Sequence, residues 1–184
     1  MNDSLRRLWR WVRWPLTLLA LGFIVLVAWR LKLLYEQDDT NAAVAAIHAN
    51  RLTQEDVFGD LPPEPNEAEN NATLAGIDSN NNGIRDDVER AIYFKYQESA
   101  KAAAPAFQYA KALQMEFTRV YNSETLVAVI QEEGRGYSCV YGREEEVENL
   151  VFNTEMRKKF REDIREKFMT SYKSLNEEDC DIIL

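Results

Sequence analysis

Histidine and cysteine are scarce in this sequence. Its 184 residues include one histidine, His48, and two cysteines, Cys139 and Cys180, with no C-x-x-C pair. These counts argue against a zinc centre, a dithiol redox site and a histidine-dependent nucleophile. No serine has the context of a nucleophile either. We therefore do not expect an enzyme. A carboxylate-dependent hydrolase of the glycosidase type stays open as an alternative, because acidic residues are abundant.

Positive charge is scarce beyond the first 35 residues. The chain has a net charge of −9, yet its first 35 residues carry six cations and one acid, so residues 36–184 carry about −14. An acidic segment of this kind repels phosphate backbones, which argues against nucleic acid as a partner. It also raises the local concentration of cations.

One long apolar run stands near the N-terminus. It is unbroken from Trp14 to Trp29 and continues to Tyr35, with Arg30 and Lys32 as cations that can snorkel to the interface. As a helix, residues 14–35 can cross a hydrocarbon core of roughly 30 Å and contact membrane lipid. Four arginines precede the run and two cations follow it, so the positive-inside rule predicts a cytoplasmic N-terminus.

A cleaved secretory signal and a buried helix of a soluble protein are the alternatives for this segment. Signal cleavage requires small residues just after the apolar core, where this chain has Trp29 to Leu33. We therefore expect an uncleaved signal anchor, whereas cleavage would release a soluble secreted protein. The expected division is a cytoplasmic start at 1–13, a transmembrane anchor at 14–35, a stalk and linker at 36–77, and an exported periplasmic or extracellular domain at 78–184.

The cysteines fit this export. Both lie in the expected exterior part, where a disulfide can form and persist. A Cys139–Cys180 bond would close a loop of about 40 residues and contribute about 3 to 4 kcal/mol in the chain-entropy model. Two free buried thiols are the alternative.

The sequence after residue 36 predicts linker first and helices later. Thr53 can cap one helical turn, and residues 59–73 read as an extended linker because proline, asparagine and acid dominate them. Beyond residue 88 the apolar spacing is helical. The expected helices begin at Glu89, at Pro105, at Asn122 or Ser123 with an end at Gly134, at 143, and at Asn153 or Thr154.

The C-terminal part of the sequence predicts a turn and an amphipathic helix. Glycines 134, 136 and 142 predict a turn that presents Cys139. The last helix should pack its apolar stripe inward and leave its basic residues on a solvated face, with a docking surface for acids or lipid headgroups as the alternative. The stripe comprises Met156, Phe160, Ile164, Phe168 and Tyr172, and the basic residues are Arg157, Lys158, Lys159, Arg161, Arg165 and Lys167.

The segment Asp78 to Glu89 carries the most specific chemical pattern. It matches D-x-[DN]-x-[DN]-G-x5-E at every specified position. Calcium prefers six to eight oxygen ligands, which a tight loop supplies from alternate side chains, one backbone carbonyl and a closing glutamate. Gly83 permits the sharp turn. The expected ligands are Asp78, Asn80, Asn82, the carbonyl of Ile84, Asp86 and Glu89.

On these residues, the segment resembles an EF-hand calcium loop of the single loop-helix variety found in dockerin-like and other extracellular bacterial motifs. The resemblance covers about 15 to 25 residues, so it implies a Ca²⁺ site and no family for the whole chain. It departs from a full EF-hand because residues 64–77 contain Pro65 and Gly76 and predict no entering helix. A polar turn that stabilises the next helix is the alternative.

These observations predict a mainly α protein. A transmembrane helix and an extended linker should precede a small domain of about four to five helices that the calcium loop opens. We expect a non-enzymatic, calcium-stabilised component of the cell envelope, anchored in the cytoplasmic membrane, that acts through structure, interaction or assembly with another envelope or extracellular protein.

Overall fold

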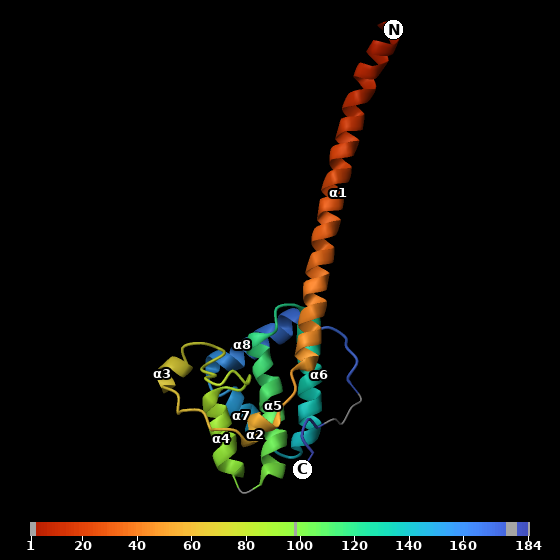
Figure 1. The fold of residues 1–184 in the computed structure, drawn as a ribbon. Helices are drawn as coiled ribbons and strands as arrows, with labels where there is room; N and C mark the ends of the chain where they lie inside the picture. The colour runs from red at the N-terminus through yellow and green to blue at the C-terminus, as the bar shows by residue number, and fades with distance from the viewer. Residues whose placement is uncertain (1–2, 98, 176–179, 184) are drawn as a thin grey trace. The chain divides into compact units, whose positions relative to one another are not determined.

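The computed structural model describes residues 3–97, 99–175 and 180–183, with side chains from Arg13 onward. This part of the chain contains eight α-helices and no strand, which confirms the mainly α fold class. The chain divides into two compact units, residues 1–42 and 43–184, which are described separately below. Figure 1 shows the order of the helices along the chain.

Helix α1 runs from Asp3 to Ala49 and contains the expected apolar segment. Within the described residues it is the one helix that is long and apolar enough to cross a membrane, judged by length and composition. Its apolar side chains are exposed, with Leu18 at 66% and Phe23 at 67%. The helix continues well beyond residue 35, because the alanine-rich stretch that follows has high helix propensity.

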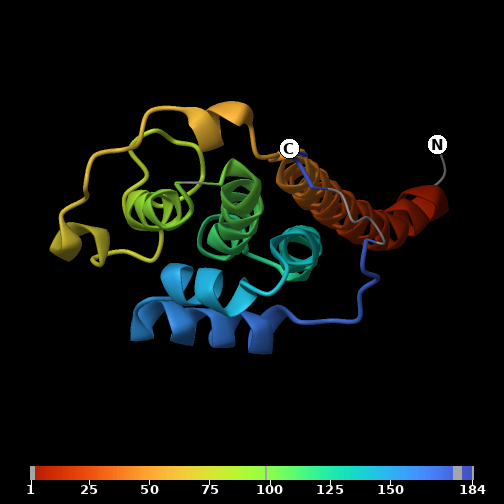
Figure 2. The ribbon, with the colours of Figure 1, turned by 90° about the horizontal axis from the view of Figure 1, so that it is seen from below.

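The compact unit of residues 43–184 is built around α5 (Ala100–Thr118). This helix contacts α2 (Gln54–Phe58), α4 (Asp86–Tyr96), α6 (Ser123–Val140) and α7 (Glu144–Val151). Figure 2, viewed along α5, shows α4 and α6 on either side of it and α7 across a third side. Nearly every side chain from Ala103 to Glu116 is buried, so this central helix is the scaffold that positions the other elements.

The ends of α5 and α6 differ from the sequence prediction. Helix α5 starts five residues before Pro105, so this proline lies inside the helix instead of opening it. Helix α6 does not end at Gly134 but continues to Val140, which places Cys139 on a helix and not in a glycine turn. A Cβ at Gly136 would lie 2.8 Å from the Tyr109 Cα, so glycine here permits close packing of α5 against α6.

Residues 43–77 belong to the same compact unit as the predicted domain, although the sequence analysis assigned them to a stalk and linker. Ile47 packs with Ala112, Met115, Ala128 and Val129. Thr53 caps α2 as predicted, through a capping box with Asp56. A single turn, α3 (Glu67–Asn70), follows, and its last residue is buried. Leu52 and Val57 belong to the main core cluster, and polar contacts such as that of Arg157 with the Asn70 carbonyl hold the later part of the segment.

Helix α8 (Glu155–Phe168) begins after the Thr154 cap, as predicted, but its inner face differs from the expected stripe. Ile164 is buried and Phe160 and Phe168 pack beside it, as predicted, whereas Met156 is 43% exposed and Tyr172, beyond the helix end, is 47% exposed. Arg157 is fully buried, and the side chains of Arg161 and Arg165 are 21% and 31% exposed. The basic residues therefore do not form one solvated face, because three arginines spaced four apart turn inward.

Candidate metal centre

The predicted calcium loop connects the polar segment after α3 to helix α4. Helix α4 begins at Asp86, three residues earlier than expected, so the last four loop positions form its first turn. Asp86, Asp87 and Glu89 lie in that turn, where carboxylates interact favourably with the positive end of the helix dipole. The local fold therefore follows the loop-helix order of the resemblance.

Two backbone positions with positive φ bend the loop. Asn81 has φ 57° and Gly83 has φ 88°, a region that glycine adopts without a steric penalty. The bend directs the Asn82 and Gly83 amides to the Asp78 carboxylate, which accepts from them at 3.2 and 2.9 Å. The first predicted ligand is therefore held on the inside of the turn.

Three of the predicted ligands converge. The Asn80 amide group donates to both carboxylate oxygens of Glu89, at 3.3 and 3.2 Å, and the Asn82 amide group donates to Glu89 Oε2 at 3.1 Å. Glu89 is only 4% exposed. Rotation of either amide about χ2 exchanges its NH₂ for its oxygen and would present an oxygen ligand beside the carboxylate, at the cost of the hydrogen bond that the oxygen accepts from the Asn82 or Ile84 backbone amide.

The other two predicted ligands occupy different surroundings. Asp86 is fully buried and accepts from Ser79, at 2.9 Å from the backbone amide and 2.6 Å from the hydroxyl. The Ile84 side chain is also fully buried, and it belongs to the core cluster of α4 and α5 with Val88 and Ile92. The Ile84 side chain thus anchors the loop to the core.

The negative charges of Asp78 and Glu89 are unfavourable in their buried surroundings. Burial raises the pKa of Glu89 to about 7, and the neighbouring charges of Asp86 and Asp78 add to this shift against the lowering by Asn80 and Asn82. Burial also raises the pKa of Asp78, although backbone hydrogen bonds oppose the shift. The described residues include no group of three or more His, Cys, Asp or Glu side chains placed to hold a metal ion. A cation here would therefore need amide and carbonyl oxygens as well.

Arg85 lies in the loop and connects it to α7. Its side chain is fully buried and donates to the carbonyls of Val151 at 3.1 Å and Leu150 at 2.9 Å. It also pairs with Asp87, which accepts a further hydrogen bond from Asn153. No sequence pattern marks Arg85, because position 8 of the calcium pattern is unspecified and the two carbonyls that it contacts lie 65 and 66 residues away.

Arg157 holds the segment that enters the loop. From α8 it donates to the backbone carbonyls of Asn70 at 2.7 Å, Thr73 at 3.2 Å and Leu74 at 3.0 Å. Burial, together with the charge of nearby Arg85, lowers the pKa of Arg157 to about 10, so it stays protonated at neutral pH. From the sequence, Arg157 is predicted to be one of several surface cations of the last helix. No local pattern distinguishes it from the other basic residues there.

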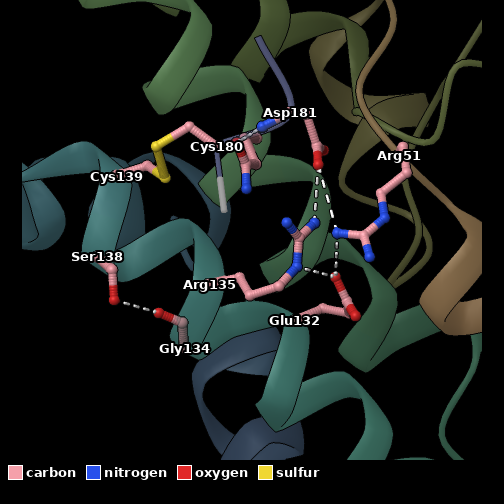
Figure 3. The surroundings of a disulfide bond; sticks show 9 residues. Arg51, Glu132, Gly134, Arg135, Ser138, Cys139, Cys180 and Asp181 are labelled. Carbon is pink, nitrogen blue, oxygen red and sulfur yellow. Dashed lines mark hydrogen bonds and ion pairs between the residues drawn. A yellow bond between two sulfur atoms is a disulfide. The ribbon is translucent and has the colours of Figure 1, made fainter. Parts of the chain in front are cut away.

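Cys139 and Cys180, the predicted pair, form a disulfide with their sulfurs 2.03 Å apart. Figure 3 shows the bond beside a group of charged side chains. Asp181, the residue after Cys180, accepts from Arg135 at 2.8 Å and from the Leu52 amide at 2.8 Å. The disulfide therefore places Asp181 against both α6 and the start of the compact unit.

The only histidine of the sequence also belongs to this charged group. His48 Nδ1 lies 2.7 Å from Glu132 Oε1, and Glu132 Oε2 accepts from Arg135 Nε at 2.8 Å. Glu132 is 4% exposed, and its burial raises its pKa. These contacts give His48 a partner in the fold.

Comparison with known proteins found no match, whether among family models, curated proteins or solved structures. The inference about function therefore rests on the loop, the apolar helix and the contacts described above.

Proposed function

We propose that the chain is a membrane-anchored calcium-binding protein of the cell envelope. Residues 14–35 would lie in the cytoplasmic membrane with the N-terminus in the cytoplasm. The calcium ion would be held by the carboxylates of Asp78, Asp86 and Glu89, the amide oxygens of Asn80 and Asn82, and the Ile84 carbonyl. The observation that carries this proposal is the convergence of two amides on a buried glutamate whose negative charge has no cationic partner among its hydrogen bonds.

Calcium suits this site better than a proton or a monovalent cation. Burial of Glu89 beside two other carboxylates opposes its ionisation, and a divalent ion would offset that cost by neutralising two charges at once. With three carboxylates and two amides as ligands, the expected dissociation constant is that of extracellular calcium modules, about 10⁻⁴ to 10⁻³ M.

The role that follows is structural. A bound ion would order the loop, the loop carries Arg85, and Arg85 donates to the C-terminal carbonyls of α7. Arg157 holds the preceding segment to α8. Calcium would therefore strengthen the connection between the entering segment and the helices, and the domain would serve as a stable interaction or assembly module for another envelope protein.

Calcium-dependent thermal unfolding of the full chain in detergent micelles tests the proposal. At calcium a hundred times the dissociation constant, binding should stabilise the native state by about 2.7 kcal/mol. That corresponds to a rise in Tm of about 5 to 10 °C for a protein of this size. The Asp78→Ala/Glu89→Ala variant should show no rise.

Glu155→Ala is the matched control, because the Glu155 side chain is 91% exposed on α8 and lies outside the loop. It should retain the full calcium response. Identical melting curves for the wild type in chelator and in calcium at a hundred times the expected dissociation constant would contradict the metal site, and with it the proposed role of calcium.

A further inference from the structure

Two buried glutamates outside the loop have incomplete hydrogen bonding. Glu116 on α5 is fully buried, and Glu133 on α6 is 7% exposed. Arg165 Nη2, on α8, donates to Glu116 Oε1 at 2.6 Å and to Glu133 Oε2 at 2.8 Å. The remaining oxygens, Glu116 Oε2 and Glu133 Oε1, are buried and have no hydrogen-bond donor among the residues that the structure describes. One orphaned oxygen on each of two neighbouring carboxyl groups calls for an explanation.

The charges around the pair do not balance. The titratable and charged side chains that face it are Tyr109 on α5, Glu148 on α7, and Arg161 and Arg165 on α8. Arg161 is shared, since it contacts Glu116 Oε1 at 3.4 Å and Glu148 at 3.0 Å. Tyr109 donates its hydroxyl hydrogen to Glu148 at 2.6 Å and brings no charge. Three carboxylates thus face two guanidinium groups, an excess of one negative charge.

We propose that Glu116 and Glu133 together bind one proton, which is carried on one of the two orphaned oxygens and donated to the other. A single proton supplies the missing donor, satisfies both oxygens and removes the excess charge. A metal ion fits less well, because two guanidinium groups already lie against Glu116 Oε1 and would repel it, whereas a proton needs no added volume.

The electrostatics of Glu133 agree with this arrangement. Burial raises its pKa well above the usual range, and its hydrogen bond and charge interaction with Glu116 raise it further against the effect of Arg165 and Arg161. Because the folded pKa is raised, the native state holds the proton and unfolding releases it. The stabilisation is complete below the unfolded pKa and is lost as pH rises through the folded pKa.

Proton release on unfolding tests the site. The full chain in detergent micelles and chelator is unfolded by urea at several pH values around 6, above the ordinary pKa of a glutamate, and the slope of the unfolding free energy against pH gives the number of protons released. Glu133→Gln should release about one proton fewer than the wild type, because its amide NH₂ can donate permanently to Glu116. Glu116→Gln should behave in the same way. The control Glu155→Gln should match the wild type.

Infrared spectroscopy gives an independent readout. In chelator at about pH 6, the band of protonated carboxyl groups should be larger in the wild type than in Glu133→Gln, because the variant lacks the shared proton. An equal band in the two proteins, or an unchanged number of released protons in either glutamine variant, would overturn the proposal. Glu89, whose pKa is about 7, contributes equally to both proteins in chelator, so the outcome is separate from that of the metal site.

Discussion

At the scale of single residues, the two most informative groups are a glycine and an arginine. Gly83 permits a bend that directs two backbone amides to Asp78, and Arg157 supplies donors to three carbonyls of a segment that has few apolar side chains. Both act on backbone and not on the apolar core. Their contributions to the free energy of unfolding can be measured separately, because Gly134 and Lys158 offer control positions for the same kinds of substitution.

Gly83→Ala should destabilise the protein by about 1 to 2 kcal/mol. With φ 88° the backbone of residue 83 is in the left-handed region, where a Cβ clashes with the following carbonyl oxygen. The urea midpoint measures this loss. Gly134→Ala is the matched control: Gly134 lies inside α6 and an added Cβ meets nothing within 4 Å, so helix propensity should stabilise the variant by up to about 1 kcal/mol. Equal midpoints for the two variants would contradict the strained bend.

At the scale of elements, the segment between α2 and α4 depends on α8. Arg157→Met keeps most of the side-chain volume but leaves the carbonyls of Asn70, Thr73 and Leu74 without these donors. We expect a loss of about 3 kcal/mol or more, since unsatisfied buried polar groups cost about 1 to 3 kcal/mol each. Hydrogen exchange should show faster opening of residues 66–77.

Lys158→Met is the control for this prediction. The Lys158 side chain is 51% exposed and pairs with Glu155, which is also exposed, so its loss should change stability by less than about 0.5 kcal/mol. A similar effect of both substitutions would show that the segment is held by something other than Arg157.

Local chemistry made the helix starts after the Thr53 and Thr154 caps predictable, whereas distant partners made the buried charges unpredictable. Thr53 and Thr154 accept from amides three residues ahead, a distance that a sequence pattern captures. The carbonyls that bind the buried Arg157 side chain lie more than 80 residues away in the sequence. Gly136 is tolerated inside α6 because Tyr109, on α5, leaves no room for a Cβ at this position. The ligand spacing of the loop is local too, but the roles of Arg85 and Glu133 are not.

At the scale of the whole molecule, the proposed anchor predicts that the mature protein keeps its N-terminal helix. Protein extracted from native membranes should have an intact mass that includes residues 14–35, because bulky residues from Trp29 to Leu33 occupy the positions where signal peptidase requires small ones. An intact mass that corresponds to a chain beginning near residue 46 would show cleavage. The protein would then be a soluble exported domain.

The contact between Leu52 and Asp181 also affects the order of folding. It joins positions 129 residues apart, whereas α5 and α6 are sequence neighbours that can pair as soon as both have been synthesised. Contacts of long sequence separation form late, because the entropy of closing a long loop must be overcome first. The disulfide between Cys139 and Cys180 would shorten that search, since it brings Asp181 to α6 before the contact with Leu52 closes the unit. A chain in which Cys139 and Cys180 are already oxidised would therefore close the contact between Leu52 and Asp181 faster than a reduced chain.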